Sequence, residues 1–295
     1  MMGLVDGDII VYRAAFAAER KRYIGYGKVA DEEGGLAVEP VPFWDDYDYH
    51  AMMRKAKEMG YDGVESEAIV ELEPVENALN NANEMIEAMK EKTGVTDIEV
   101  YLSTGEESFR HKAATMLPYK GNRKAPKPVH YEAVRQHLID VWGALVFKSV
   151  EADDILAIMQ KYTPDDTVIC SVDKDLLTIP GKHYHFVNKE MFTVSEEEAL
   201  RNWYMQMLMG DTTDNIPGIK GMGPVKAAKL IDNTPPEEWW DMLVDAWTAH
   251  VGNRDKALEV IDEVRILITI GDDDAIQAID ESGEAATLRP IQVPA

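Results

Sequence analysis

The stretch Gly3-Leu-Val-Asp-Gly-Asp-Ile-Ile-Val-Tyr12 decides the fold, because a short apolar run ends in a carboxylate and is followed at once by helical spacing. It predicts a strand that ends at Asp6, then a turn and a helix. A second apolar run, Thr167-Val-Ile-Cys-Ser-Val172, is likewise followed by acids, at Asp173 and Asp175. Continuous apolar runs of this kind are typical of the buried strands of a parallel sheet.

Strands and helices alternate through most of the chain. This alternation predicts an α/β fold in which helices flank a mostly parallel, doubly wound sheet. Residues 24–75 resist assignment apart from a helix near 48–59, and the polar tail after Asp272 is expected to be loose. The other predicted strands are 98–102, 144–148 and 183–187, and the other predicted helices are 76–92, 130–142, one from 151, 198–209 and two within 236–268.

Acidic residues gather where the predicted strands end. Ligands of open α/β sheets bind at the carboxyl ends of the strands, so we expect these carboxylates to converge there. Any one group taken alone is explained as a helix cap. Together they would repel one another unless cations were bound, and an all-oxygen set suits Mg²⁺ or Mn²⁺. The expected metal ligands are Asp6, Glu151, Asp153, Asp154, Asp173, Asp175, Asp211 and Asp214.

The bulk composition bounds the class of protein. A chain of 295 residues with 45% hydrophobic residues can bury a sizeable core. No apolar run is long enough for a membrane helix, and Asp6 and Asp8 interrupt the only N-terminal apolar stretch, so neither a membrane partner nor a signal peptide is expected. The one cysteine, Cys170, suits a reducing compartment, and we expect a cytoplasmic protein, in the host cell if a phage encodes it.

The net charge of −24 is unevenly distributed. Residues 108–131 contain six lysines and arginines and no acid, and residues 215–229 contain three lysines and no acid. Chance is the alternative reading of these two cationic islands. The functional interpretation is that these two stretches contact phosphates, because such contact depends on local positive charge.

Five motifs occur in order along the chain: Leu4-Val-Asp-Gly-Asp8, Tyr119-Lys-Gly-Asn-Arg123, Glu151-Ala-Asp-Asp154, Ser171-Val-Asp-Lys-Asp175 and Gly210-Asp-Thr-Thr-Asp-Asn-Ile-Pro-Gly-Ile-Lys-Gly-Met-Gly223. With them the chain resembles the 5′→3′ exonuclease and flap endonuclease superfamily, which includes the 5′-nuclease domain of bacterial DNA polymerase I. At this length it looks like a stand-alone, phage-type exonuclease. The resemblance implies a PIN-like sheet followed by a helix–three-turn–helix region.

The resemblance also implies an activity and roles for residues. The activity is Mg²⁺-dependent hydrolysis of DNA phosphodiesters near free 5′ ends or 5′ flaps, by two metal ions and with 5′-phosphate products. An RNA–DNA hybrid is a further expected substrate. The catalytic set is Lys120, Arg123, Asp154 and Asp173, with Asp154→Asn expected to abolish cutting in a folded protein. The DNA-binding set is Arg13, Arg110, Tyr119, Lys120, Arg123, Lys124, Gly221, Gly223 and Lys226, and a K⁺ ion is expected at the glycine-rich turn.

One departure leaves the ligand set open. The family has an Asp at the end of the strand before the Phe-Arg pair, whereas here that strand runs Tyr101-Leu-Ser-Thr-Gly105. Either Glu106 or Glu107 takes this duty, or the site has one carboxylate fewer. We expect a nuclease core over 1–190 with a basic arch at about 108–128, a DNA-binding helix–three-turn–helix region over 191–235, and a C-terminal helical extension over 236–295. The rival interpretations are a PIN-like RNA nuclease, an inert DNA-structure binder and an acidic cation store.

Overall fold

The computed structural model describes residues 1–28, 41–61, 63–104, 108–123 and 125–287. It confirms the predicted fold class: a six-stranded sheet of order β6-β5-β1-β7-β8-β9 is parallel except for its last pair. The strands of this sheet are β1 (Met2–Asp6), β5 (Asp97–Ser103), β6 (Leu145–Phe147), β7 (Thr167–Cys170), β8 (Gly181–His185) and β9 (Glu190–Val194). The helices are α1 (Gly7–Ala17), α2 (Tyr49–Glu58), α3 (Val75–Thr93), α4 (Phe109–Ala113), α5 (Tyr131–Trp142), α6 (Ala152–Tyr162), α7 (Glu196–Met209), α8 (Pro224–Asp232), α9 (Trp239–Val251), α10 (Arg254–Ile268) and α11 (Asp273–Ser282).

The register of the sheet brings the first motif next to the later ones. β1 lies in the middle and pairs in parallel with β5 on one side and β7 on the other, with Leu4 opposite both Glu99 and Ile169. Parallel strands end at the same edge, so Asp6, the end of β5 and the residues after β7 meet there. The helix α1 begins directly at Gly7, without the predicted turn.

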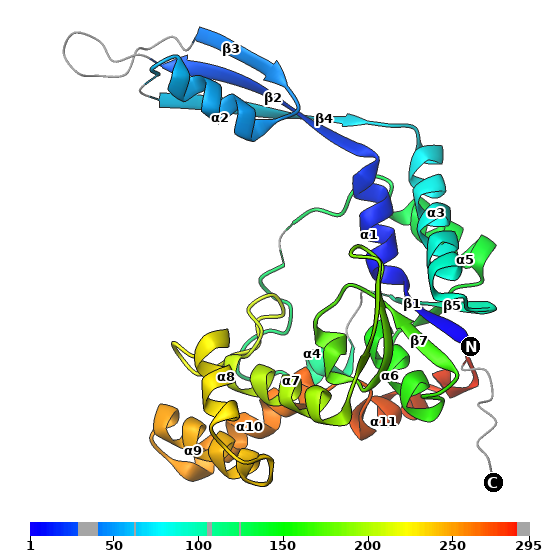
Figure 1. Ribbon diagram of the computed structural model, residues 1–295, viewed down its shortest axis with the longest axis vertical. Coiled ribbons are helices and arrows are strands. Elements are labelled where there is room, and N and C mark those ends of the chain that lie inside the picture. Colours follow the sequence, from blue (N-terminus) through cyan, green and yellow to red (C-terminus); the bar gives the residue numbers. More distant parts are fainter. Residues whose placement is uncertain (29–40, 62, 105–107, 124, 288–295) are drawn as a thin grey trace. The chain divides into compact units, whose positions relative to one another are not determined.

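The described chain forms two compact units. The first comprises residues 1–11, 83–127 and 135–295, and the second comprises 12–82 and 128–134. In the second unit, β2 (Glu19–Lys28) pairs antiparallel with β3 (Val41–Asp46) and β4 (Gly63–Leu72), and α2 packs on this sheet (Figure 1). The sequence predicted α2 but not the sheet, because Gly25 and Gly27 break the apolar alternation of β2. Those glycines leave room for Met52 and Tyr61.

Two apolar clusters lie among the described residues of the first unit. One lies between the sheet and α6, and the end of the chain completes it: Ile270, Ala275 and Ile279 pack in the same core as Leu4 and Phe147. The expectation of a loose tail after Asp272 was therefore wrong, since α11 carries two of these buried residues.

The second apolar cluster of this unit is helical. It joins α7, α8, α9 and α10 through Met207, Ala227, Trp247 and Ile261 (Figure 1). The predicted Ser195 capping box at the start of α7 is present, with Ser195 Oγ accepting from the Glu198 amide at 3.2 Å. No helix in the described ranges is both long and apolar enough to cross a bilayer.

Candidate active site

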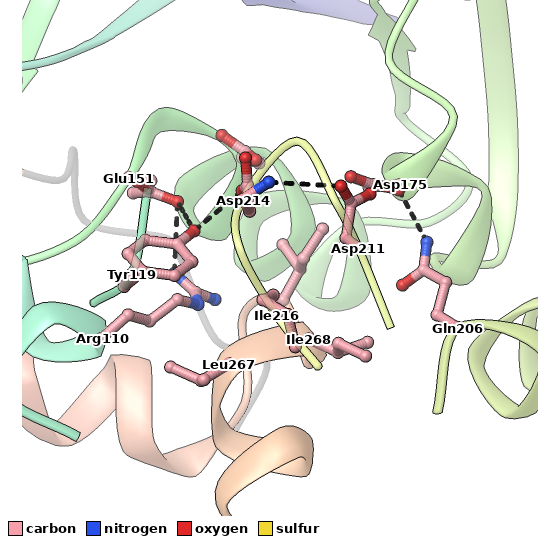
Figure 2. A pocket seen from close by; sticks show the side chains of 12 residues that line it. Arg110, Tyr119, Glu151, Asp175, Gln206, Asp211, Asp214, Ile216, Leu267 and Ile268 are labelled. Carbon is pink, nitrogen blue, oxygen red and sulfur yellow. Dashed lines mark hydrogen bonds and ion pairs between the residues drawn. The ribbon is translucent and has the colours of Figure 1, made fainter. Parts of the chain in front are cut away.

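A small pocket lies in the first unit, beside the carboxyl edge of the sheet (Figure 2). Five of its lining residues are acids from three parts of the chain, and aliphatic side chains from the end of α10 form another part of its wall. The lining residues are Arg110, Tyr119, Glu151, Asp153, Asp175, Gln206, Asp211, Asp214, Ile216, Leu267, Ile268 and Ile270.

Asp6 closes β1 and is 4% exposed. Its carboxylate accepts hydrogen bonds from the amide of Ile9 at 3.2 Å and from Ser171 Oγ at 2.9 Å. Burial, and then the negative charge of Asp8, raise its pKa to about 7. A carboxyl in such surroundings favours the neutral form until a cation compensates its charge.

Glu151 is the N-cap of α6, where the helix dipole favours a negative charge. Its carboxylate accepts from Lys120 Nζ and from the hydroxyl of Tyr119, the latter at 2.8 Å. Burial alone would raise its pKa, but the charges of Lys120 and Arg110 outweigh burial and lower the pKa to about 2. Asp153 is the second residue of α6, and burial together with the charge of Glu151 raises its pKa well above the usual range.

The other wall of the pocket carries Asp175, Asp211 and Asp214. Asp175 Oδ1 accepts from Gln206 Nε2 at 2.8 Å, and burial, followed by the charge of Asp173, raises the pKa of Asp175 to about 7. Asp211 accepts from Lys174 Nζ at 2.9 Å, and the pKa of Asp211 is lowered because this contact outweighs burial.

The loops 118–123 and 211–215 are joined by hydrogen bonds beside the pocket. The amide of Lys120 donates to the Asp214 carbonyl at 2.8 Å, and Asn215 Nδ2 donates to the Pro118 carbonyl at 2.9 Å. Arg123 pairs with the Asp214 carboxylate, which also accepts from the Tyr119 hydroxyl at 3.1 Å. Both Lys120 and Asn215 have positive φ, 54° and 60°, so these contacts hold the backbone in a conformation that it rarely adopts.

The sequence of this chain matches the model of a known family. The 5′-3′ exonuclease, N-terminal resolvase-like domain family matches residues 49–205, which is more than half of the 295 residues. The chain belongs to this family. It is 32% identical over 183 residues to thermostable DNA polymerase I of Thermus aquaticus, covering 57% of this chain and 21% of that protein. It is also 29% identical over 126 residues to flap endonuclease Xni of Shewanella baltica, covering 38% and 48% of the two chains.

The chain thus spans about a fifth of the length of the polymerase that it matches. Among solved structures, the T5 D15 protein co-crystallized with metal ions has a TM-score of 0.59 at 15% identity, with 96% of this chain and 94% of that chain covered. This likeness shows a shared fold across nearly the whole length of both chains.

Three of the expected site residues bind one another or the acids of the pocket. Asp154 is fully buried, and its two oxygens accept from the two terminal nitrogens of Arg110, each at 2.7 Å. Asp154 Oδ1 also accepts from the Gly271 amide at 2.9 Å, so its oxygens face the core and not the pocket. Arg110 is 2% exposed, and both of its terminal nitrogens are engaged by Asp154. Tyr119 is 5% exposed, and its hydroxyl donates to Glu151 and Asp214.

The remaining expected site residues are placed as follows. Asp173 holds the turn after β7 by accepting a hydrogen bond from the Asp175 amide at 2.9 Å. Its negative charge contributes to the raised pKa values of Asp6 and Asp175. Arg13 is exposed on α1 and belongs to the second unit. Lys124, Glu106 and Glu107 lie outside the described residues.

The glycine-rich turn joins α7 to α8, as the sequence predicted. Gly221 has φ 79°, and its carbonyl accepts from Lys226 Nζ at 2.8 Å. Gly223 is the N-cap of α8, and Lys226 and Lys229 are exposed on that helix. The turn therefore presents backbone and lysines to solvent.

Sequence reasoning missed three residues that hold the acids in place: Ser171, Lys174 and Gln206. Ser171 and Lys174 stand inside the Ser171–Asp175 motif, so their position was a signal for them. Gln206 lies in the middle of α7, where nothing in the sequence marks it.

The donor set of the pocket fits a hard divalent ion, because it consists of carboxylate oxygens. Within the described ranges, no three acid, histidine or cysteine side chains form a ready-made metal cluster. The reason is visible in the contacts: Lys120, Arg123 and Lys174 each occupy a carboxylate of this pocket. A divalent ion that binds here has to displace those side-chain cations.

Proposed function

We propose that this family member is a divalent-metal-dependent 5′→3′ exonuclease and flap endonuclease that acts on DNA. The observation that carries the proposal is the pocket lined by Glu151, Asp153, Asp175, Asp211 and Asp214, three of which pair with the side-chain cations Lys120, Arg123 and Lys174. Acids from separate motifs would not be gathered at one place for stability alone, since their mutual repulsion has to be offset.

The metal-binding residues in this proposal are Asp6, Glu151 and Asp153 for one ion and Asp173, Asp175, Asp211 and Asp214 for a second. Two Mg²⁺ or Mn²⁺ ions would supply an activated water and stabilise charge on the phosphodiester oxygens. Asp154 is left out of this set and has a structural task, which is to hold Arg110 behind Glu151, 3.7 Å from its carboxylate.

Lys120 and Arg123 are the groups proposed to contact the scissile phosphate. Both carry a permanent positive charge here, since the acids around Lys120 and Arg123 outweigh burial and raise their pKa values. Their loop is fastened to the 211–215 loop, and so the positive charges are fixed beside the acids. Such preorganised charge stabilises the extra negative charge that develops on the phosphate during cleavage.

The turn between α7 and α8 is the proposed grip on duplex DNA. Exposed Lys226 and Lys229 and the backbone around Gly221 and Gly223 fit phosphate binding, with K⁺ a candidate ion at this turn. Contacts of this type read no sequence, so selection of free 5′ ends would come from shape. The division into core, grip and C-terminal extension belongs to the same proposal.

The proposal is tested with a duplex that carries a 5′ label and, in parallel, with a 5′ flap. We expect nucleotides with 5′-phosphates to be released in Mg²⁺ and none in EDTA. Binding of either substrate without release in Mg²⁺ or Mn²⁺ would identify an inert DNA-structure binder instead. Release from single-stranded RNA but not from DNA would favour the RNA nuclease interpretation.

A further inference from the structure

Asp8 stands in the first turn of α1, two residues after Asp6, and its side chain reaches the end of the neighbouring strand β5. Asp8 Oδ2 accepts from the Ser103 amide at 3.0 Å and from Ser103 Oγ at 2.5 Å. Ser103 is the last residue of β5, where the resemblance leads us to expect a carboxylate. A carboxylate is thus present at the end of β5, but it comes from α1.

The contacts of Ser103 connect Asp8 to the pocket. Ser103 Oγ accepts from the amide of Ala152 at 3.0 Å while it donates to Asp8. Ala152 is the first residue of α6 and directly follows Glu151, the N-cap. One hydroxyl therefore fixes Asp8 relative to the helix that carries Glu151 and Asp153.

The second oxygen of Asp8 is left without a hydrogen bond. Asp8 Oδ1 is buried and accepts no hydrogen bond, and its ion-pair partner Arg135 Nη1, 3.7 Å away, is likewise buried without a hydrogen-bond acceptor. A buried acceptor with no donor costs free energy, so such groups call for an explanation. Asp8 also adds its negative charge to those of Asp6 and Glu151.

We infer that Asp8 is an additional carboxylate ligand for the divalent ion held by Asp6 and Glu151, with Ser103 as its positioning residue. The inference rests on the proposed function, because it assigns a further residue to the same site. A bound cation would coordinate the Asp8 oxygen that accepts no hydrogen bond and offset the repulsion among three neighbouring acids. Ser103 would orient this ligand as outer groups orient ligands in metal sites.

The test uses calorimetry to measure Mn²⁺ binding to the full chain without DNA. The Asp8→Asn variant is compared with wild type. Asparagine still accepts the Ser103 hydrogen bonds, and so the variant removes charge while keeping the local contacts. We expect affinity to fall by about 10- to 100-fold. The matched control is Asp97→Asn, an exposed acid at the other end of the same strand, which should bind Mn²⁺ as wild type does.

The outcomes separate this inference from the proposed function. Wild type without measurable Mn²⁺ binding overturns the proposed function and the inference with it. Equal affinity in wild type and Asp8→Asn, with or without a lower melting temperature for the variant, overturns the role of Asp8 alone and leaves it a structural residue. If circular dichroism shows that Asp8→Asn does not fold, Ser103→Ala takes its place, and wild-type Mn²⁺ affinity in that variant counts against the inference.

Discussion

The ammonium of Lys120 contacts the carboxylate of Glu151, so a base from the loop at 118–123 and an acid from the start of α6 neutralise each other. The same arrangement recurs between Arg123 and Asp214. The residues proposed to bind the DNA phosphate therefore occupy the residues proposed to bind metal. Metal binding is therefore coupled to the release of Lys120 and Arg123 towards DNA, since one carboxylate cannot bind both a metal ion and a side-chain cation at full strength.

Replacing Lys120 with methionine separates the two roles. Glu151 loses its competitor, and we expect Mn²⁺ to bind several-fold more tightly. The turnover of a 5′-labelled duplex should fall by about 10²- to 10³-fold, because a fixed positive charge near the reacting phosphate is lost. Calorimetry with Mn²⁺ and single-turnover cleavage check the two effects. Lys256→Met, an exposed site at the start of α10, is the matched control; weaker Mn²⁺ binding in Lys120→Met would contradict the competition.

The acids of the pocket should make stability depend on pH. Burial and Asp8 raise the pKa of Asp6 to about 7, and burial and Asp173 raise that of Asp175 to about 7. A carboxyl whose pKa is higher in the folded state binds a proton on folding, so its stabilising contribution is full below about pH 4 and is lost as the pH rises to about 7. In EDTA we therefore expect the free energy of unfolding to decrease from about pH 5 to about pH 8, by one or more kcal/mol as an order of magnitude.

Two other groups with shifted pKa values do not add to this decrease. Glu151, whose pKa is lowered to about 2, changes its charge below this pH range and so does not affect how stability changes between about pH 5 and about pH 8. His183, whose pKa burial lowers, acts in the opposite sense, since it loses stability as the pH falls. Denaturation in urea across this range is the measurement, and Asp6→Asn should flatten the profile. A saturating divalent ion should restore stability at about pH 8; a rising or unchanged profile in EDTA would refute the assignment.

The pair formed by Arg110 and Asp154 should govern stability. Both side chains are buried and joined by two hydrogen bonds of 2.7 Å. Arg110→Met leaves the Asp154 charge without its partner, and we expect a loss of about 3–5 kcal/mol in the free energy of unfolding. Arg110→Met combined with Asp154→Leu should recover much of that loss. Urea denaturation measures it, and a single variant as stable as wild type would show that the pair is dispensable.

The sequence predicted the sheet and the gathering of acids for a physical reason: β1, β7 and their following acids are local patterns, and parallel pairing brings their ends together. The role of Asp154 was not predictable in this way. Its neighbour in space, Arg110, lies 44 residues away, and only packing shows that the two neutralise each other in the core. For the same reason Asp8 was overlooked, since its link to Ser103 joins residues 95 positions apart. The β2–β3–β4 sheet escaped notice because glycines and charges obscure its alternation.

Two glycines of the α7–α8 turn allow the proposed DNA grip to be tested apart from the fold. A Cβ on Gly218 would lie 1.8 Å from the Met209 carbonyl oxygen, and that backbone cannot yield without opening the turn. Gly218→Ala should therefore lower the free energy of unfolding by about 2 kcal/mol or more. A Cβ on Gly223 would meet nothing within 4 Å, and its φ of −102° suits any residue. We expect Gly223→Ala to change stability by less than about 1 kcal/mol.

Affinity for DNA then distinguishes the two variants. If phosphates approach the backbone at the start of α8, the added methyl of Gly223→Ala obstructs them, and duplex affinity measured in Ca²⁺ should fall several-fold while the melting temperature stays near that of wild type. Lys226→Ala should weaken binding to all sequences alike and reduce the salt dependence of affinity by about one phosphate contact. Wild-type affinity in both variants would place the duplex elsewhere on the chain, because neither the open backbone nor the exposed lysine of this turn would then touch a phosphate.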